Sequence, residues 1–314
     1  MRPSVMRAAV TSGFGGIDRL EVRDDVPLPR PAAGEVLVEV GACCCNNSDI
    51  WRGEGAYGRE DDPQAQAGWL RGGEPPRFPL IQGADIVGRV VELGVEVQPC
   101  WLGRRVLVDH TLHDTRSAEP YGIAGIFGSE RDGGVAQYAT APATSLGVIT
   151  ADELSDVQVA ALGAASFVTA IRMLKRARLA AGELVLVAGA SGGVGTAVVV
   201  DVVGGPLFST FLAVLRPLGR HVTVGAVAAP LVELDLRPLY LKHLDLLGST
   251  LGTVEDFHEL VALINERRLE PVVAETFALE DIHAAQAAFR HKQAAGNFVI
   301  RVAQGAGTSP AHPV

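Results

Sequence analysis

The sequence is poor in cysteine, and the few cysteines are arranged in a way that argues against disulfides. Only four occur in 314 residues, and three of them, Cys43, Cys44 and Cys45, are consecutive, whereas Cys100 stands alone. Adjacent cysteines make poor disulfide partners because the geometry of the bridge is specific. Reduced thiols are the rule in the cytosol. We therefore expect a cytoplasmic protein whose fold does not depend on disulfides.

Positive charge and long apolar runs are also scarce. Lysine and arginine number 27 against 36 aspartates and glutamates, which gives a formal net charge of −9. Nucleic acids and anionic membrane surfaces both select basic faces, so neither is an expected partner. No stretch of about 18 residues is both apolar and uncharged, which argues against a membrane-spanning helix. A small-molecule substrate is the partner that we expect.

The hydrophobic periodicity changes along the chain and indicates two domains, as the length also suggests. The first 150 residues favour strands, for example over residues 35–40, 86–93 and 105–108. From Ser155, a capping-box pattern opens a helix-compatible run that ends near Arg178. Further elements are then predicted: strands over 220–224, 244–247 and 298–302, and helices over 254–264 and 279–292.

A glycine-rich segment carries the main chemical signal. Residues 183–188 form a short apolar run, typical of a strand buried on both faces of a parallel sheet. In the loop that follows, Gly192 and Gly193 would let the backbone approach a pyrophosphate at a helix N-terminus, and Gly195 would allow close helix packing. Ala190 stands where the dinucleotide fingerprint has its first glycine, and a plain strand-to-helix turn is the alternative. The predicted pyrophosphate site consists of Ser191, Gly192, Gly193, Val194 and Gly195.

Several short motifs occur in a familiar order: residues 34–40, 46–49, 81–88, 132–138, 188–195 and 201–205. Together they resemble the zinc-independent branch of the medium-chain dehydrogenase/reductases, which is quinone-oxidoreductase-like and alcohol-dehydrogenase-like. The resemblance implies an α/β plus β fold. A GroES-like, β-rich catalytic domain would span residues 1–154 and be completed by 266–303. A shortened Rossmann-type nucleotide-binding domain with a parallel sheet would span 155–265, and a disordered tail would span 304–314.

The resemblance also implies that zinc is absent. Zinc-dependent relatives have a cysteine where this chain has Asn46, and a Gly-His-Glu signature where it has Gly83, Ala84 and Asp85. A catalytic zinc needs three protein ligands, and at best one carboxylate remains here. The consecutive cysteines cannot easily share an ion, because neighbours on an extended chain point to opposite faces. His110 and His113 are interpreted as solvated loop residues.

By resemblance, the reaction would be hydride transfer from NADPH to a quinone or an α,β-unsaturated carbonyl. Asn46 and Ser48 would reach the substrate carbonyl, Tyr57 matches an active-site tyrosine, and Asp49 would orient the site. The alternative for Asn46 and Ser48 is a capped turn between a strand and a helix. The positions that match the nicotinamide surroundings, each of which could equally be a packing residue at a strand end, are Thr169, Gly225, Ala226, Ser249 and Thr250.

The chain departs from the family after the glycine loop. Relatives continue with a full helix and further strand and helix pairs, whereas residues 196–199 run directly into 200–205. Roughly 60 residues of the expected nucleotide-binding domain are missing. They include the residue, about 20 positions after the glycine loop, that contacts the adenine ribose in relatives. We expect a smaller sheet, with the adenosine half of the cofactor site left open. A crossover between parallel strands needs about a dozen residues, and residues 189–199 barely reach that length.

Two other functions stay open. The chain could be a non-catalytic or impaired relative that acts as a binding or scaffold protein, because its cofactor domain is incomplete. It could also be an alcohol dehydrogenase that uses NAD(H) without zinc. We further expect a homodimer that pairs through an edge strand at 244–251, because exposed strand edges invite pairing. The alternative is that this segment is an internal strand.

Overall fold

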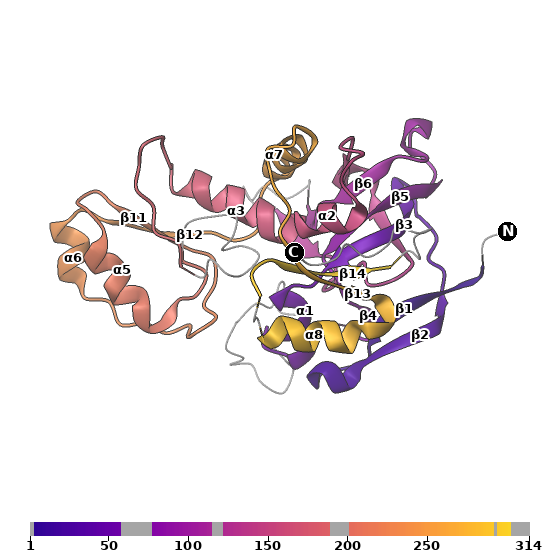
Figure 1. Cartoon of the computed structure of the whole chain (residues 1–314), viewed down its shortest axis with the longest axis horizontal. Helices are drawn as coiled ribbons and strands as arrows, with labels where there is room; N and C mark the ends of the chain where they lie inside the picture. The colour runs from indigo at the N-terminus through magenta and orange to yellow at the C-terminus, as the bar shows by residue number, and fades with distance from the viewer. Residues whose placement is uncertain (1–2, 58–76, 115–121, 189–200, 292–293, 303–314) are drawn as a thin grey trace, which may run out of the picture.

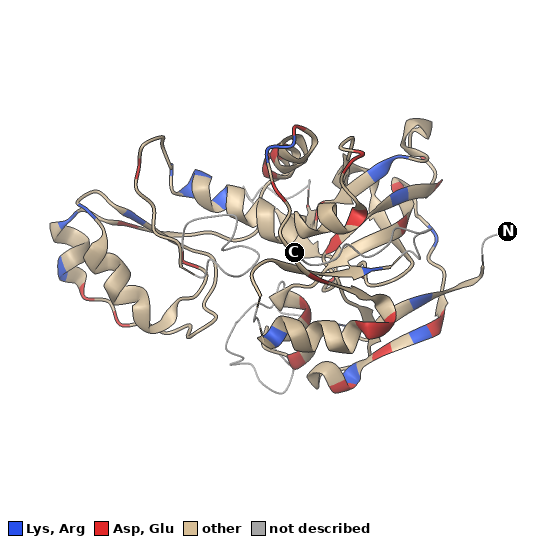
Figure 2. Ribbon diagram, in the orientation of Figure 1, with Lys and Arg blue, Asp and Glu red and all other residues tan. Residues whose placement is uncertain are grey.

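The computed structural model describes residues 3–57, 77–114, 122–188, 201–291 and 294–302. A large β-rich body occupies one end of the molecule and a small lobe the other, with helix α3 (Ala164–Arg176) running between them (Figure 1). Acidic and basic residues are interspersed over the described chain (Figure 2). None of the described helices is long and apolar enough to span a membrane.

The body is built around β3 (Glu35–Cys44), which lies inside a seven-stranded sheet: six strands follow the order β10-β6-β5-β3-β14-β13, and the seventh, β9, also pairs with β3. β3 pairs with β5 (Asp85–Leu93) on one side. On the other side its first half pairs with β9 and its second half with β14 (Asn297–Arg301). The last strands of the chain thus complete a sheet begun by the first. The remaining strands are β6 (Arg105–Val108), β9 (Tyr138–Pro142), β10 (Leu146–Val148) and β13 (Val273–Ala278).

Smaller elements surround this sheet. A three-stranded sheet contains β2 (Leu20–Pro27), β1 (Val5–Thr11) and β4 (Leu80–Ile81), and a two-stranded one contains β7 (Thr111–His113) and β8 (Ile123–Ile126). Helices α1 (Asn47–Glu54) and α8 (Ile282–His291) lie beside the body (Figure 1). Short 3₁₀ turns are η1 (Gly16–Arg19), η3 (Pro99–Trp101), η4 (Ala143–Ser145), η5 (Gly205–Leu207) and η6 (Leu279–Asp281).

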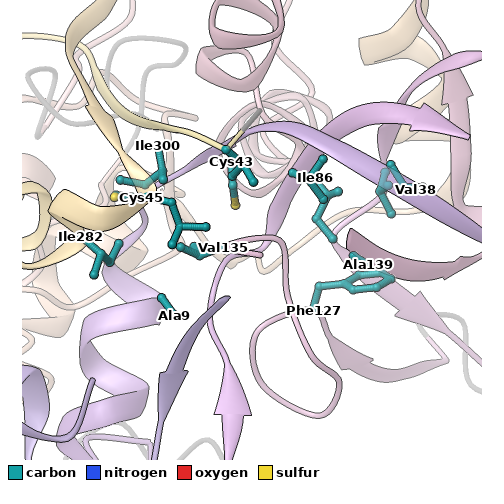
Figure 3. Close-up of a cluster of buried hydrophobic side chains, with 14 of the residues drawn as sticks. Ala9, Val38, Cys43, Cys45, Ile86, Phe127, Val135, Ala139, Ile282 and Ile300 are labelled. Carbon is teal, nitrogen blue, oxygen red and sulfur yellow. The ribbon is translucent and has the colours of Figure 1, made fainter. Parts of the chain in front are cut away.

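The two faces of the central sheet bury separate hydrophobic clusters, because successive strand residues point to opposite sides. Cys43 and Cys45 join the cluster that contains Ile86 and Ile300 (Figure 3). Cys44 points to the other face, where α2 (Asp156–Ala161), α3 and α7 (Val254–Asn265) pack. The three thiols are free and buried, and burial raises their pKa, so they behave as small apolar side chains. The expectation that they point to opposite faces is confirmed.

The small lobe contains a parallel pair, β11 (Arg220–Thr223) and β12 (Asp245–Gly248), with helices α5 (Phe208–Val214) and α6 (Leu236–Leu241). Asp201 extends this sheet through single parallel bridges to Thr223 on one side and Ala188 on the other. The described sheet is therefore small, as the missing segment predicts. The helix predicted from Ser155 to Arg178 is interrupted, because α2 ends at Ala161 and α3 begins at Ala164.

The predicted buried strand over residues 183–188 is wrong. Within this described segment only Ala188 makes a bridge, and residues 183–187 have no regular structure. Leu184 is fully exposed and Leu186 is 56% exposed. An apolar run becomes a doubly buried strand only when neighbouring strands and helices cover both faces. The shortened domain does not supply that cover among its described residues.

Candidate functional site

A cleft of about 1070 Å³ lies between the body and the small lobe, and the predicted site residues gather on its walls. α1 forms one wall, α3 another, and the segments that follow β11 and β12 close the far side. The lining includes every predicted site residue that the structure describes: Asn46, Ser48, Tyr57, Thr169, Gly225, Ala226, Ser249 and Thr250. The predicted pyrophosphate loop, Ser191, Gly192, Gly193, Val194 and Gly195, lies outside the described residues.

Asn46 is the N-cap of α1, so the capping alternative is realised for this residue. It forms a capping box with Asp49, whose Oδ2 accepts the Asn46 backbone N–H at 2.8 Å. The Asn46 side-chain nitrogen donates to the Cys44 carbonyl at 3.3 Å and to Asp85 Oδ2 at 2.9 Å. Both partners are acceptors, so the amide nitrogen must face them and both of its N–H groups are used. In this arrangement Asn46 has no N–H left for a substrate carbonyl.

Ser48 and Tyr57 are the hydroxyl groups that α1 and its C-terminal extension bring to the cleft. Ser48 is half-buried in the first turn, and Tyr57 follows the helix end. The Tyr57 ring lies 6.0 Å from that of Trp51, and the Arg52 guanidinium lies 4.9 Å from the centre of the Tyr57 ring. Burial raises the pKa of Tyr57 to about 12, although Arg52 opposes the shift. Tyr57 is therefore a neutral phenol at pH 7, able to donate a hydrogen bond.

Two buried carboxylates hold the base of the site. Asp49 Oδ1 accepts the Gly83 N–H at 3.1 Å, and burial raises the pKa of Asp49 to about 7. Asp85 accepts the Ala165 N–H at 2.8 Å besides its bond to Asn46, and burial raises the pKa of Asp85 to about 6. Gly163 leaves room for Asp85, because a Cβ there would lie 2.3 Å from the carboxylate carbon. Asp85 thus joins β5, the start of α1 and the start of α3.

The cofactor side of the cleft is made where strands end. Gly225 and Ala226 follow β11, and Ser249 and Thr250 follow β12, so they meet at the carboxyl edge of parallel strands, the usual position for a dinucleotide. Gly225 is needed there, since a Cβ would lie 2.9 Å from the Val202 carbonyl oxygen. The Ser249 hydroxyl oxygen is buried without a hydrogen-bond partner in the described part of the chain. These features fit the nicotinamide end of a dinucleotide.

Known proteins share this architecture. Residues 32–151 match the family described as alcohol dehydrogenase GroES-like domain, and residues 182–300 match the family described as zinc-binding dehydrogenase. A crystal structure of a candidate alcohol dehydrogenase from Sinorhizobium meliloti 1021 is 40% identical, with 96% of this chain and 97% of that chain covered and a TM-score of 0.89. The chain belongs to the medium-chain dehydrogenase/reductase superfamily.

Two relatives of this dehydrogenase/reductase have names that specify a reaction. A quinone oxidoreductase from Lama guanicoe is 25% identical, covering 94% of this chain and 97% of the relative. An acryloyl-coenzyme A reductase from Metallosphaera sedula is 27% identical, covering 94% and 99%. The first alignment runs over 357 positions, more than the 314 residues of this chain, so the relative has residues with no counterpart here. Both relatives are oxidoreductases, and the comparison supports an NAD(P)H oxidoreductase in general.

The family name includes zinc, but the described residues of this dehydrogenase/reductase do not fit a zinc ion. Among them, no group of three or more His, Cys, Asp or Glu side chains could hold a metal. At the family position, Asn46 turns its nitrogen donors toward Asp85, and Ala84 offers no ligand atom.

The interpretation of His110 and His113 as solvated loop residues is wrong for His110, which is buried, and His113 ends β7 and is half-buried. Asp109 and His110 are each only 2% exposed, because the β7 and β8 hairpin folds back over them. Asp109 Oδ2 lies 3.0 Å from His113 Nε2, and Asp109 Oδ1 accepts the Thr111 N–H. His110 lines the cleft.

Sequence reasoning missed three further residues of this dehydrogenase/reductase site. Asp201 Oδ1 accepts the N–H groups of Val203 and Gly204 and shapes a turn that lines the cleft. His110 and Arg52 also lie on the wall of the cleft. A usable signal existed for Arg52, which follows Ser48 by four positions on α1 and so shares its helix face.

Proposed function

We propose that the chain transfers hydride from NADPH, without zinc, to a quinone or an α,β-unsaturated carbonyl. One observation carries the proposal: a single cleft joins the hydroxyl groups of Ser48 and Tyr57 to the strand ends at Gly225 and Ser249. The quinone oxidoreductase and acryloyl-coenzyme A reductase relatives support this substrate class. When bound, the nicotinamide supplies the hydride.

The protein's own groups would bind and polarise the acceptor. Tyr57 and Ser48 would donate hydrogen bonds to the acceptor oxygen, where negative charge develops as hydride reaches the substrate carbon. Donors aimed at developing charge in a site shielded from water stabilise the transition state more than the ground state. Tyr57, or water behind it, would supply the proton that completes the reduction. Asn46 and Asp85 would hold α1 in place and not touch the substrate oxygen.

On the cofactor side, the buried Ser249 hydroxyl would hydrogen-bond the nicotinamide amide, beside Thr250 and Thr169. The Thr169 hydroxyl donates to the Ala165 carbonyl at 2.7 Å, which leaves its oxygen as an acceptor. The pyrophosphate would lie on residues 191–195, as the sequence predicts. Buried reduced thiols at Cys43, Cys44 and Cys45 support a cytoplasmic location.

NADPH oxidation by purified protein, with a benzoquinone and an α,β-unsaturated ketone as acceptors, tests the proposal. Loss of NADPH absorbance that depends on the acceptor is the expected result. Elemental analysis of tag-free protein should find no stoichiometric zinc. Failure to reduce either acceptor overturns the reaction, and about one zinc per chain overturns the zinc-free mechanism.

Two alternatives have observations in their favour. The 40% identity to a candidate alcohol dehydrogenase favours alcohol oxidation with NAD⁺, which an assay at high pH would detect. The small described sheet and the exposed Leu184 favour a binding or scaffold protein with an impaired cofactor domain. Titration of NADPH, followed by its fluorescence, on protein of confirmed intact mass distinguishes these alternatives. Both enzymes should bind the dinucleotide, and the scaffold should not.

A further inference from the structure

Arg52 is a buried cation on the wall of the cleft, and no described residue forms a close ion pair with it. Its side chain is 5% exposed in the last turn of α1. The guanidinium Nε has no hydrogen-bond partner in the described chain. Its ion-pair contact among the described residues is Glu130, with 3.8 Å between Arg52 Nη2 and Glu130 Oε1, beyond hydrogen-bond distance. The Tyr57 ring packs against the guanidinium at 4.9 Å.

This arrangement is costly for the protein alone. A guanidinium carries five N–H donors, and burying such donors without acceptors is unfavourable. Glu130 is held away from closer contact, because its Oε2 accepts the Ile126 N–H at 2.9 Å. Glu54, which belongs to α1 and lines the cleft, is paired with Arg290. The cleft wall therefore includes a buried cation whose N–H donors are not matched by acceptors among the described residues.

The position of Arg52 determines how far the group that it would bind lies from the carbonyl oxygen of a substrate. Ser48 and Arg52 are four residues apart on α1, so their side chains share a face and lie about one helical turn, roughly 5–6 Å, apart. Both line the cleft together with Tyr57. A substrate whose carbonyl oxygen meets Ser48 and Tyr57 would reach Arg52 with a group two carbons away.

We propose that Arg52 is the subsite for a carboxylate of the substrate, which makes 4-oxo-2-enoic acids the favoured acceptor class. The proposal rests on the proposed enone reduction for the chemistry, but the anion subsite can be measured separately. A carboxylate matches the planar guanidinium fork with two parallel hydrogen bonds, which a lysine or a neutral ester cannot provide.

Binding of a saturated probe tests the subsite without turnover. 4-Oxopentanoate and its methyl ester share the ketone, and only the acid has a carboxylate. Calorimetric titration of the wild-type full chain should show the acid binding about 10- to 100-fold more tightly than the ester, since charge-assisted pairs are worth that much. Arg52→Gln should abolish the difference. Arg237→Gln, on an exposed arginine of α6 outside the cleft lining, should preserve it.

Two further variants keep the test decisive if Arg52→Gln does not fold. Arg52→Lys retains the charge but loses the fork, so acid binding should weaken several-fold while ester binding is unchanged. Glu130→Gln removes the neighbouring negative charge and keeps an oxygen for the Ile126 N–H, so acid binding should become tighter. Equal affinity of wild type for acid and ester, or no effect of either variant on acid binding, overturns the proposal.

Turnover with 4-oxo-2-pentenoate and its methyl ester separates the two proposals. Reduction of both, with the acid favoured in kcat/KM and the preference lost in Arg52→Gln, supports both. If neither is reduced although the saturated acid binds through Arg52, the proposed reaction fails and the anion subsite stands. If both are reduced at equal kcat/KM and the saturated acid binds no better than its ester, the subsite fails and the reaction stands.

Discussion

At the scale of single residues, the side chains around α1 divide into those that hold the helix and those that line the cleft without a structural partner. Asn46 and Asp49 form the capping box, and Asp85 ties Asn46 to the start of α3. Ser48 and Tyr57 present hydroxyl groups to the cleft. The two groups should respond differently to substitution, in stability for the first and in turnover for the second.

Tyr57→Phe should lower kcat about 10- to 100-fold and change the NADPH dissociation constant less than about twofold. A hydrogen bond that strengthens in the transition state acts on turnover and not on cofactor binding. Asn46→Ala should instead cost about 1–3 kcal/mol of unfolding free energy, because it removes the hydrogen bonds to the Cys44 carbonyl and to the buried Asp85. Steady-state kinetics and urea unfolding check the pair. Unchanged turnover in Tyr57→Phe would remove that residue from the site.

Stability should increase when the pH falls from 7.5 to 5.5. Burial raises the pKa of Asp49 to about 7 and of Asp85 to about 6, both above the usual carboxyl value. The folded state therefore binds protons more readily than the unfolded state in this range, so stability is lost as pH rises through these pKa values. The Asp49 contribution amounts to about 1–2 kcal/mol.

Urea unfolding at the two pH values, with Asp49→Asn as the comparison, measures this effect. The variant should be less stable than wild type at both pH values, because an amide cannot accept both N–H groups that Asp49 accepts. Its stability should nevertheless change less between pH 7.5 and 5.5. The same change in both proteins would show that Asp49 does not titrate in this range.

At the scale of elements, β12 is the strand available for assembly. It pairs with β11 on one side, and no other described strand pairs with its opposite edge. We predict that two copies associate through the segment 244–251, since an open edge offers unpaired N–H and carbonyl groups. Light scattering should give a dimer mass at micromolar concentration. Leu246→Lys, on this half-buried strand, should shift the mass toward the monomer, and a wild-type monomer would count against the prediction.

At the scale of the whole molecule, the shortened cofactor domain should bind its dinucleotide weakly and with little preference. The sequence lacks the segment that would read the ribose or its 2′-phosphate, and loss of such a charge-assisted contact costs about 1.5–3 kcal/mol. NADPH and NADH should therefore bind with similar, low affinity. The small lobe should also lower the melting temperature, because exposed residues such as Leu184 contribute little burial.

Parallel fluorescence titrations with NADPH and NADH measure the discrimination. Tight binding of NADPH with a strong preference over NADH would show that another residue reads the 2′-phosphate.

The sequence by itself determined the features that depend on short-range pattern. Alternation along β3 placed Cys43 and Cys44 on opposite faces, and the capping-box pattern at Ser155 marked a helix start. The order of the short motifs was enough to identify the superfamily and to predict residues that line the cleft. Each motif is local, and the order of the motifs along the chain can be read directly from the sequence.

Only the tertiary structure decided which groups are buried and what they face. Residues 183–188 have the composition of a core strand, yet they lie outside a strand because the shortened lobe offers them too little cover. Asp109 and His110 have a loop's composition, yet a hairpin buries them. The amide nitrogen of Asn46 faces Asp85, and the guanidinium Nε of Arg52 is buried without a hydrogen-bond partner in the described part of the chain. Burial and hydrogen bonding are set by segments far apart in the sequence, so no local pattern could have revealed them.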